Sequence, residues 1–379
     1  MKKQIAIVTV THPADDVRIC HKEALFLAQN GWDVTILAPS VEKPFCDGIK
    51  FVSIPGSKNR LDGLCFLRTR ILEAIEKIGA RTLILHDTEL MTLIPLLRNM
   101  GYKVIFDVRN ESLSLPGAIA LKALQRRFLP AADGVIAATG PIANRLSLIG
   151  LSPVLVRNRL TKAEISFIEH ALLNEKAMKN TVCYAGLISK RCGAERMVKA
   201  CFKANATLLL AGRFESDTFR SELESMPEYI CVKYEGVLDR CGIASLLARS
   251  QAGLLLPYDT PCHRESEPIK LFEYLAAGLP VIASDFDYWR TLGAGNRISF
   301  AKSDDEAARL IRKTLDDTAL LGQIHFHRDA MQRKFCFDRD GDNLLRLCER
   351  VSGNDIRPLP PNDIYYTEIS KEYDNAKRR

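Results

Sequence analysis

Short β-like apolar runs alternate with amphipathic stretches of helical period along the first 160 residues. This alternation of strand and helix patterns predicts a doubly wound parallel sheet. The strands are expected at residues 5–10, 33–38, 50–54, 82–85, 103–107, 134–137 and 154–156. The helices are expected near residues 18–30, 61–78, 89–100, 117–129 and 140–149.

The alternation stops and then starts again in the second half of the chain. Residues 158–180 are charged and lack a strand pattern, which indicates a linker or an interdomain helix. A less regular patch precedes residue 239. The later strands are expected at 181–185, 207–210, 253–256 and 279–283, and the later helices at 193–205, 239–249, 303–316 and 338–351.

The pattern predicts an α/β chain of two Rossmann-like, doubly wound parallel-sheet domains facing a cleft, because ligands of such sheets bind beyond the carboxyl ends of the strands. The N-terminal domain is expected at 1–160 and the second at 161–335. A closing helix at 336–353 can pack back on the first domain, and a polar tail at 354–379 is expected to lie loosely on the surface. With 379 residues, 47% of them apolar, the chain can fill two cores.

The segment from Glu265 to Ala283 is the most informative part of the sequence. A nearly all-apolar helix is expected between Pro268, which suits a first helical turn, and Gly278, which suits a helix end. Glu273 lies inside this helix, eight positions after Glu265. The positive end of a helix favours a diphosphate, and a carboxylate further along can accept hydrogen bonds from a ribose diol. The alternative is a surface helix whose Glu273 faces solvent.

The pair Glu265–x7–Glu273 resembles the paired-glutamate signature of retaining glycosyltransferases of the GT-B fold, family 4. The run 268–286, with Trp289 and Arg290 after it, is similar to the bacterial surface-polysaccharide and lipopolysaccharide branch. This resemblance implies transfer of a sugar from a UDP- or GDP-sugar to a glycan or lipid-linked acceptor. It also implies chemistry without a cofactor and without a metal ion.

The resemblance assigns the donor nucleotide sugar to the second half of the chain. It implies that Glu265 is catalytic and holds a hydroxyl of the sugar, while Glu273 binds the ribose. The diphosphate is expected at the helix start near Ser266 and Glu267, with Lys270 as a nearby cation.

A loop between two glycines, 186–193, follows the first strand of the second half. The family that this chain resembles often has Arg after the first glycine and Lys before the second, where they hold the departing diphosphate. This chain has Leu187 and Cys192 there, so two other basic residues of the loop either substitute for them or are only solvated charges. The residues 234–238 resemble a loop whose backbone meets the nucleotide base. The donor-binding residues expected from the two loops are Gly186, Lys190, Arg191 and Leu238.

The resemblance also implies roles for the first half. The stretch after the first strand is similar to a branch with a His and an Asp-x-Arg-Ile, so His12 and Arg18 are expected on the acceptor side, while Asp16 could merely cap a helix. Many family members place a His where this chain has Arg109, in contact with the donor sugar. Arg109 can bind a phosphate but cannot act as a base at neutral pH. His86, at a strand end, is the other catalytic candidate, with a structural role as the alternative.

The formal net charge of +7 lies wholly in the first half, which holds 21 basic and 14 acidic residues up to residue 160. This excess favours an anionic partner such as the inner membrane surface, or it serves only solubility. The basic stretch 118–130 is typical of an amphipathic helix on an anionic membrane, or of a core helix whose basic face is exposed to solvent. No apolar run reaches the ~20 residues of a membrane span, and the start of the chain is typical of a strand rather than of a signal peptide. A cytoplasmic protein is expected, with or without peripheral attachment to the cytoplasmic membrane.

Several other kinds of chemistry are disfavoured. The eleven scattered cysteines contain no Cys-x-x-Cys pair, which argues against a zinc site and a disulfide framework and for reduced thiols. No Gly-x-Gly-x-x-Gly follows the first strand, so a nicotinamide or flavin enzyme is disfavoured. The Asp pair at 285 and 287 and the acidic stretch 338–349 have the wrong context for metal binding. Nucleic acid is not an expected partner, because the basic half lacks interleaved aromatic residues.

Two alternatives to the transferase stay open at this point. A GT-B sugar-nucleotide epimerase would use a similar fold without a sugar acceptor. A catalytically inactive nucleotide-sugar-binding protein would keep the donor site, and the departures at Leu187 and Cys192 favour it. The sequence does not identify the base, the sugar, the acceptor or the linkage.

Overall fold

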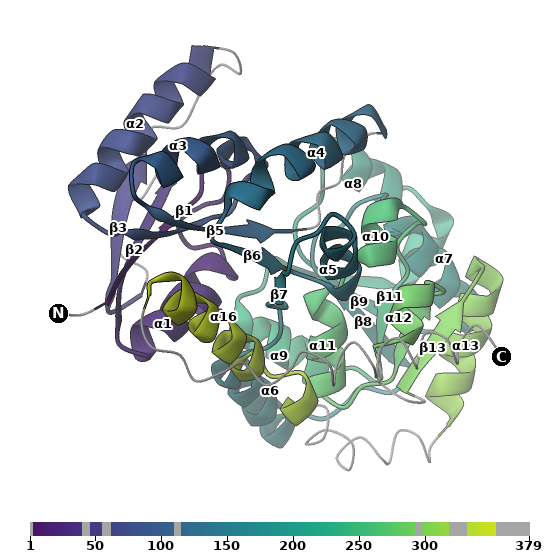
Figure 1. Ribbon diagram of the computed structural model, residues 1–379. Helices are drawn as coiled ribbons and strands as arrows, with labels where there is room; N and C mark the ends of the chain where they lie inside the picture. The colour runs from purple at the N-terminus through teal and green to yellow at the C-terminus, as the bar shows by residue number, and fades with distance from the viewer. Residues whose placement is uncertain are drawn as a thin grey trace. The chain divides into compact units, whose positions relative to one another are not determined.

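The computed structural model describes residues 3–39, 46–54, 62–109, 115–292, 297–317 and 332–353. The chain divides into two compact units. One comprises the described residues up to Asn158 together with those from Phe337 onward, and the other runs from Arg159 to Cys336. Each unit is built on one sheet whose described strand pairs are all parallel (Figure 1). The predicted pair of Rossmann-like parallel sheets is therefore confirmed.

The sheet of the first unit has the order β3-β2-β1-β4-β5-β6-β7. The chain begins in the middle of this sheet, at β1, and moves outward first to one edge and then to the other, as in doubly wound folds. The carboxyl ends of β1, β4 and β5 therefore lie next to one another. The strands are β1 (Lys3–Val8), β2 (Trp32–Pro39), β3 (Ile49–Ile54), β4 (Thr82–Leu85), β5 (Lys103–Val108), β6 (Gly134–Ala137) and β7 (Val154–Leu155).

Helices cover both faces of this sheet, because successive strand residues point to opposite faces. On β1, Ile5 and Ile7 pack into one core cluster, while Ala6 and Val8 pack into the other. The helical elements are a π-helix η1 (Ile19–Ala24), α1 (Leu25–Gln29), α2 (Asp62–Ile78), η2 (Thr88–Leu93), α3 (Ile94–Asn99), α4 (Leu115–Phe128), η3 (Leu129–Ala131), α5 (Gly140–Ser147) and α16 (Asp338–Val351).

The helix α16 belongs to the first unit although it comes last in the described chain. It packs on the same face of the sheet as η1 and α1, where Leu344 and Leu347 join the core (Figure 1). Two glycines make room for this packing. A Cβ at Gly341 would lie 2.7 Å from the ring of Phe26, and a Cβ at Gly134 would lie 2.8 Å from Leu347.

The sheet of the second unit has the order β10-β9-β8-β11-β12-β13. The chain again enters this sheet in the middle, at β8. The carboxyl ends of β8, β9 and β11 therefore lie next to one another. The strands are β8 (Thr181–Ala185), β9 (Thr207–Ala211), β10 (Val232–Gly236), β11 (Ala252–Leu255), β12 (Val281–Ser284) and β13 (Ile298–Ala301). Of these, β10 and β13 were not predicted from the sequence.

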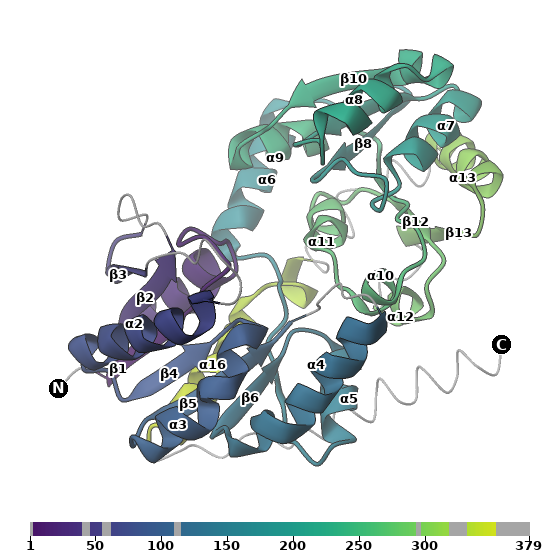
Figure 2. The same cartoon turned by 90° about the horizontal axis from the view of Figure 1, so that it is seen from above.

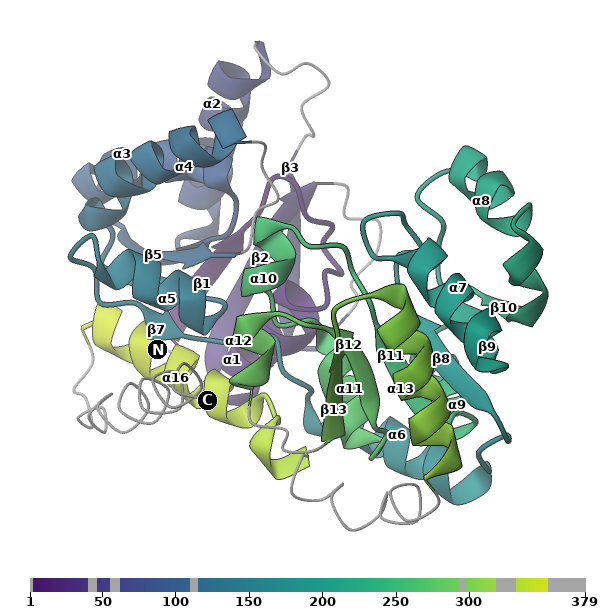
Figure 3. The ribbon, with the colours of Figure 1, turned by 90° about the vertical axis from the view of Figure 1, so that its right-hand side faces the viewer.

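The helices of the second unit surround one continuous core. Helices α7 and α13 pack side by side although α7 ends at Ala204 and α13 begins only at Asp304, as Figures 2 and 3 show. None of the helices in the described ranges is long and apolar enough to cross a membrane. The helical elements are α6 (Lys162–Asn174), α7 (Ala194–Ala204), α8 (Asp217–Glu224), η4 (Pro227–Cys231), α9 (Arg240–Ala248), α10 (Pro261–Glu265), α11 (Ile269–Ala276), α12 (Asp287–Arg290) and α13 (Asp304–Asp316).

Candidate functional site

The predicted apolar helix is present as α11. It begins at Ile269, one residue after Pro268, which is the extended N-cap residue rather than part of the first turn. Gly278 follows the helix with a φ of 76°, as expected for a residue that ends a helix. No side chain of the described residues caps the helix start, and the first backbone bond there runs from the N–H of Leu271 to the carbonyl of Pro268. The preceding N–H groups of Ile269 and Lys270 are therefore available to an anion.

Glu273 does not face solvent, because its exposed fraction is only 6%. Its Oε1 accepts a hydrogen bond of 3.1 Å from Nη1 of Arg240, the first residue of α9. Nη2 of the same arginine lies 2.9 Å from Oε1 of Glu164 on α6. These three side chains line one hollow between α6, α9 and α11. The Arg240 contact spans 33 positions, so no pattern in the sequence could reveal it.

Lys270 lies over the glycine loop that follows β8. A Cβ built at Gly186 would be 2.0 Å from Cε and 2.4 Å from Nζ of Lys270. The ammonium group is also 5.5 Å from the centre of the Tyr184 ring. The first turn of α11 thus presents a cation at the carboxyl end of β8, beside the available N–H groups.

Gly212, which follows β9, approaches the same loop. A Cβ built there would lie 1.8 Å from the carbonyl oxygen of Gly186, and the φ of Gly212 is 130°. The loops after β8 and β9 therefore touch through backbone atoms, which only glycine permits.

Replacing Gly212 by alanine is expected to destabilise the second unit by about 3–5 kcal/mol, because the backbone must move away from Gly186 and a strained φ is retained. Urea unfolding followed by circular dichroism measures the change. Gly236→Ala is the matched control, because its φ is 78° but nothing lies within 4 Å of the added Cβ, so it carries only the conformational cost of about 1–2 kcal/mol. Equal losses for the two variants would contradict the close approach of the loops.

The two other cations expected at the donor site differ in their surroundings. The charge of Arg191 acts on Cys262 and His263 of α10, while the side chain of Lys190 is exposed. Burial lowers the pKa of His263, and the charges of Arg191 and Lys270 act in the same direction. Arg191 and Lys270 are therefore both near α10, whereas the side chain of Lys190 is exposed and its backbone N–H donates to Glu215.

Glu265 and Ser266 end α10, and both are half-buried. Oγ of Ser266 donates to the carbonyl of His263 at 3.0 Å, and the carbonyl of Ser266 accepts from Nε1 of Trp289 at 2.8 Å. These bonds fix the connection between α10 and α11. Leu238 is half-buried in the loop between β10 and α9, two residues before Arg240.

Glu267 has a different environment from the other predicted donor residues. Its side chain is buried, its Oε2 lies 2.8 Å from Nη2 of Arg159, and the hydroxyl of Tyr288 donates to Oε1. The guanidinium of Arg159 in turn stacks 4.1 Å from the ring centre of Phe272 on α11. These contacts tie Glu267 to the interior of the second unit, so it supports the start of α11.

In the first unit the structure brings together all four predicted side chains, His12, Arg18, His86 and Arg109. Three of them, Arg18, His86 and Arg109, meet around Asp107, the last residue but one of β5, and His12 joins them through Asp16, which lies near both His12 and Arg109. Asp107 accepts hydrogen bonds from Arg18 at 3.1 and 3.2 Å and from Arg109 at 3.1 Å. Nδ1 of His86 lies 3.1 Å from Oδ2 of Asp107 and 3.0 Å from Nη2 of Arg109.

The carboxylates of Glu23 and Asp87 help to organise this cluster, and neither was expected there from the sequence. Glu23 on η1 is fully buried and lies 2.8 Å from Arg18 and 3.2 Å from Nε2 of His86. Asp87 accepts hydrogen bonds from Thr9, the N–H of Val10 and Thr11, and it lies 3.4 Å from His12. Asp16, expected as a cap, does accept from the N–H groups of two following residues and also lies 3.6 Å from His12.

At the centre of this cluster, ion pairing shifts the pKa values of Asp107 and His86 more strongly than burial does. Burial alone would raise the pKa of Asp107, but Arg18, His86 and Arg109 hold it well below its usual range. Burial would lower the pKa of His86, but Glu23 and Asp107 raise it despite the opposing charge of Arg109. The pKa of His12, by contrast, is lowered by burial and by Arg109. Arg109 remains partly exposed, with 17% of its side chain accessible, and His12 is more exposed at 36%.

The comparisons with known proteins agree on the fold. Sucrose-phosphate synthase from Thermosynechococcus elongatus has a TM-score of 0.72 and 18% identity, covering 93% of this chain and 99% of that one. HepE from Anabaena, solved with UDP and glucose, has a TM-score of 0.69 and 14% identity, covering 92% and 99%. WaaG, a glycosyltransferase involved in lipopolysaccharide biosynthesis, has a TM-score of 0.66 and 14% identity, covering 92% and 100%.

These similarities confirm the resemblance to GT-B glycosyltransferases at the level of the fold. No protein-family model matches the sequence, and a search of curated proteins finds no similar sequence.

Proposed function

We propose that this protein is a retaining glycosyltransferase that moves a sugar from a UDP- or GDP-sugar to a glycan or lipid-linked acceptor. The observation that supports this most strongly is the start of α11, where free N–H groups, the ammonium of Lys270 and the glycine loop after β8 come together. This combination suits a diphosphate.

The ribose site follows from the position of Glu273. It lies four residues after the first residue of α11, about 6 Å along the axis at about 1.5 Å per residue, so a nucleotide whose diphosphate binds at the helix start can bring its ribose to this side chain. The loop that carries Leu238 leads directly into Arg240, the partner of Glu273. A base against that loop would therefore place its ribose near the Glu273 carboxylate, and the ribose hydroxyls would donate to it. Glu265, which precedes α11, would hold a hydroxyl of the transferred sugar.

The chemistry in this proposal is electrostatic. As the bond between the sugar and the diphosphate breaks, the sugar becomes oxocarbenium-like and negative charge grows on the phosphate oxygens. The dipole of α11 and the cations Lys270, Arg191 and Lys190 would stabilise that charge. The acceptor hydroxyl would attack the face that the leaving group vacates, and a phosphate oxygen would take its proton. No enzyme nucleophile and no metal ion are required for these steps.

The cluster in the first unit would act on the acceptor side. Arg109 is a permanently charged, partly accessible side chain of this cluster and would bind an anionic group, while the exposed His12 and the buried Arg18 line and support the same end of the sheet. His86 was expected as a catalytic candidate, but its side chain is buried between Glu23 and Asp107. We therefore assign it to positioning Arg109.

The setting that we propose is the cytoplasm, at the inner face of the cytoplasmic membrane, in the synthesis of a bacterial surface polysaccharide. The basic first half of the chain supports contact with anionic lipid. The fold shared with WaaG is consistent with such a pathway.

A panel of UDP-, GDP-, ADP- and CMP-sugars in a thermal-shift assay tests this function, followed by product analysis without added divalent cations. We expect one nucleotide class to raise the melting temperature and its sugar to be transferred with the anomeric configuration kept, as read by NMR. A new sugar isomer would indicate an epimerase, and donor binding without turnover across a broad acceptor panel would indicate a binding protein. Either outcome would contradict the proposal.

A further inference from the structure

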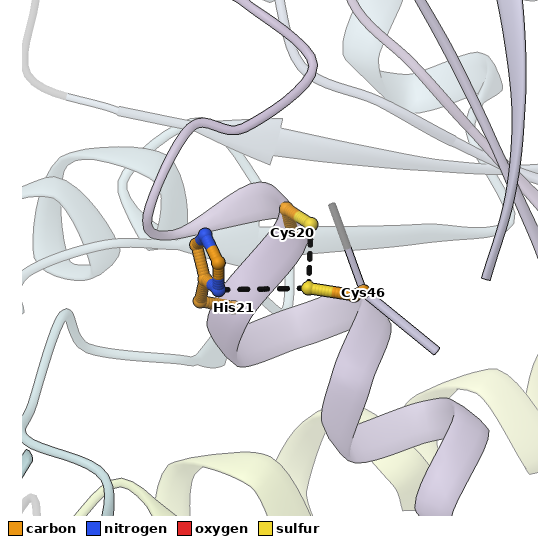
Figure 4. A group of neighbouring side chains, drawn as sticks. All are labelled: Cys20, His21 and Cys46. Atoms are coloured by element: carbon orange, nitrogen blue, oxygen red, sulfur yellow. Dashed lines mark hydrogen bonds between the residues drawn. The ribbon is translucent and has the colours of Figure 1, made fainter. Parts of the chain in front are cut away.

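Three metal-ligating side chains gather at the π-helix η1, away from the ion-pair cluster described above. Sγ of Cys20 lies 3.2 Å from Sγ of Cys46, and Nδ1 of His21 lies 3.5 Å from the same sulfur. All three ligand atoms lie within 4.8 Å of one another. Figure 4 shows both contacts meeting at Cys46, which precedes β3. The sequence did not indicate this group, because Cys46 lies 26 positions from Cys20 and no Cys-x-x-Cys spacing is present.

Two of the three distances between ligand atoms are close to those of a tetrahedral zinc site, and the third, between Cys20 and His21, is within 4.8 Å. With Zn–S bonds of about 2.3 Å and Zn–N bonds of about 2.0–2.1 Å, a sulfur and a nitrogen lie about 3.5 Å apart and two sulfurs about 3.8 Å apart. The nitrogen–sulfur distance here already has that value. The two sulfurs would have to separate by only about half an ångström, and the partly exposed position of Cys46 permits that movement.

The local chemistry favours a cation more than a disulfide. A disulfide would join the two sulfurs but would not explain why Nδ1 of His21 also lies against the sulfur of Cys46. Two thiolates and a neutral imidazole are soft donors that suit zinc, and the two negative charges balance its double positive charge. The charges of Asp15 and Asp16 also reach Cys20, which adds to the attraction for a cation.

The other candidate cluster among the described residues does not fit a metal ion. Glu23, His86 and Asp107 also have ligand atoms within 4.8 Å of one another. The guanidinium groups of Arg18 and Arg109 already contact this group, however, and occupy the place of a cation. Within the described part of the chain, no arginine or lysine pairs with Cys20, His21 or Cys46.

From this geometry we infer that Cys20, His21 and Cys46 bind one Zn²⁺ ion, with water in the fourth position. The ion fastens the start of the β3 segment to η1. Because η1 also carries Glu23, which contacts Arg18 and His86, the ion holds the helix from which that cluster is organised. Its role is to hold η1 in place, outside the sugar-transfer steps that we propose.

Proton competition gives this site a recognisable pH dependence. A cysteine binds zinc as a thiolate, so each thiol must lose its proton when the ion binds. Zinc must displace this proton, so the apparent affinity is expected to fall as the pH is lowered.

Titration of the reduced, full-length protein with Co²⁺ and then Zn²⁺ tests the inference. We expect one Co²⁺ per chain, with a sulfur-to-cobalt charge-transfer band and the visible bands of tetrahedral cobalt, and displacement by one Zn²⁺. Cys46→Ser is expected to remove the part of the charge-transfer band that comes from the Cys46 thiolate. It should also weaken zinc binding by about 100-fold or more, because even an outer-shell partner of a metal site is worth 10–100-fold.

Cys231→Ser is the matched control, because Cys231 is also a partly buried free cysteine but lies in the second unit. It should bind both metals like the wild type. Wild-type-like metal binding by Cys46→Ser, or no cobalt–thiolate band in the reduced wild type, would overturn the inference. So would a mass 2 Da below the reduced protein, mapped to a Cys20–Cys46 disulfide, together with no metal binding after reduction. The sugar-transfer assay is independent of these readouts, so failure of one proposal leaves the other standing.

Discussion

Glu273→Gln is expected to lower kcat/KM for sugar transfer by about 100-fold. A neutral amide cannot make charge-assisted hydrogen bonds with both ribose hydroxyls, and hydrogen bonds to a charged group contribute about 1.5–3 kcal/mol. A loss of that size corresponds to about tenfold for each 1.4 kcal/mol. Initial rates with the nucleotide sugar found in the thermal-shift panel, together with calorimetric affinity for the free nucleotide, measure the effect.

The control for this variant is Glu224→Gln on α8. It makes the same chemical change in the same unit, and Glu224 also pairs with an arginine, Arg220, at 2.8 Å. Because that pair is exposed, the control should retain wild-type kcat/KM. A normal melting temperature for Glu273→Gln would separate lost binding from lost folding. Turnover of Glu273→Gln within threefold of the control would remove Glu273 from the donor site.

Asp107→Asn is expected to destabilise the first unit by about 3–5 kcal/mol. Asp107 is fully buried, and two arginines donate hydrogen bonds to it. Removing its charge leaves the guanidinium of buried Arg18 with Glu23 as its remaining close counter-charge, and breaking a buried pair in this way is costly. Urea unfolding measures the loss, and Asp33→Asn is the control. The partner of Asp33, Lys50, is largely exposed, so that pair should contribute no more than about 1 kcal/mol.

The pH dependence of unfolding checks the same cluster. The lowered pKa of Asp107 contributes stability above the ordinary carboxyl range, and this stability is lost as the pH falls through it. The raised pKa of His86 contributes stability below its ordinary value, and this is lost as the pH rises through the raised value. The first unit is therefore expected to be most stable between these limits. In Asp107→Asn, the free energy of unfolding should fall less steeply as the pH is lowered. The same fall as in the wild type would contradict the charged state assigned to Asp107.

The fold could be predicted largely from local patterns, because buried parallel strands are written as short apolar runs. The two strands that escaped prediction lie at opposite edges of the second sheet. Residues 232–236 include a lysine and a glutamate and contain no fully buried position, and the two middle residues of 298–301 are only half-buried. An edge strand is half solvated, so its sequence carries less of the signal on which the prediction depends. The π-helix η1 was likewise predicted only as part of one longer helix near 18–30.

The candidate site was predictable where its parts lie close in sequence. Glu273, Lys270 and Gly278 belong to one helix and its end, so spacing alone gave their arrangement. The partners that complete the site lie far away along the chain: Arg240 contacts Glu273, and Glu23 contacts His86. Such pairs depend on which helices and strands become neighbours in the fold. The periodicity of a single sequence does not show which elements become neighbours.

A crystal structure of the protein with the nucleotide sugar that binds most tightly tests the central claim most directly. We expect diphosphate oxygens within hydrogen-bonding distance of the N–H groups of Ile269 and Lys270, with the ammonium of Lys270 beside them. The ribose hydroxyls should lie on the carboxylate of Glu273. A nucleotide bound elsewhere, or one whose diphosphate lies away from the start of α11, would contradict the proposed donor site.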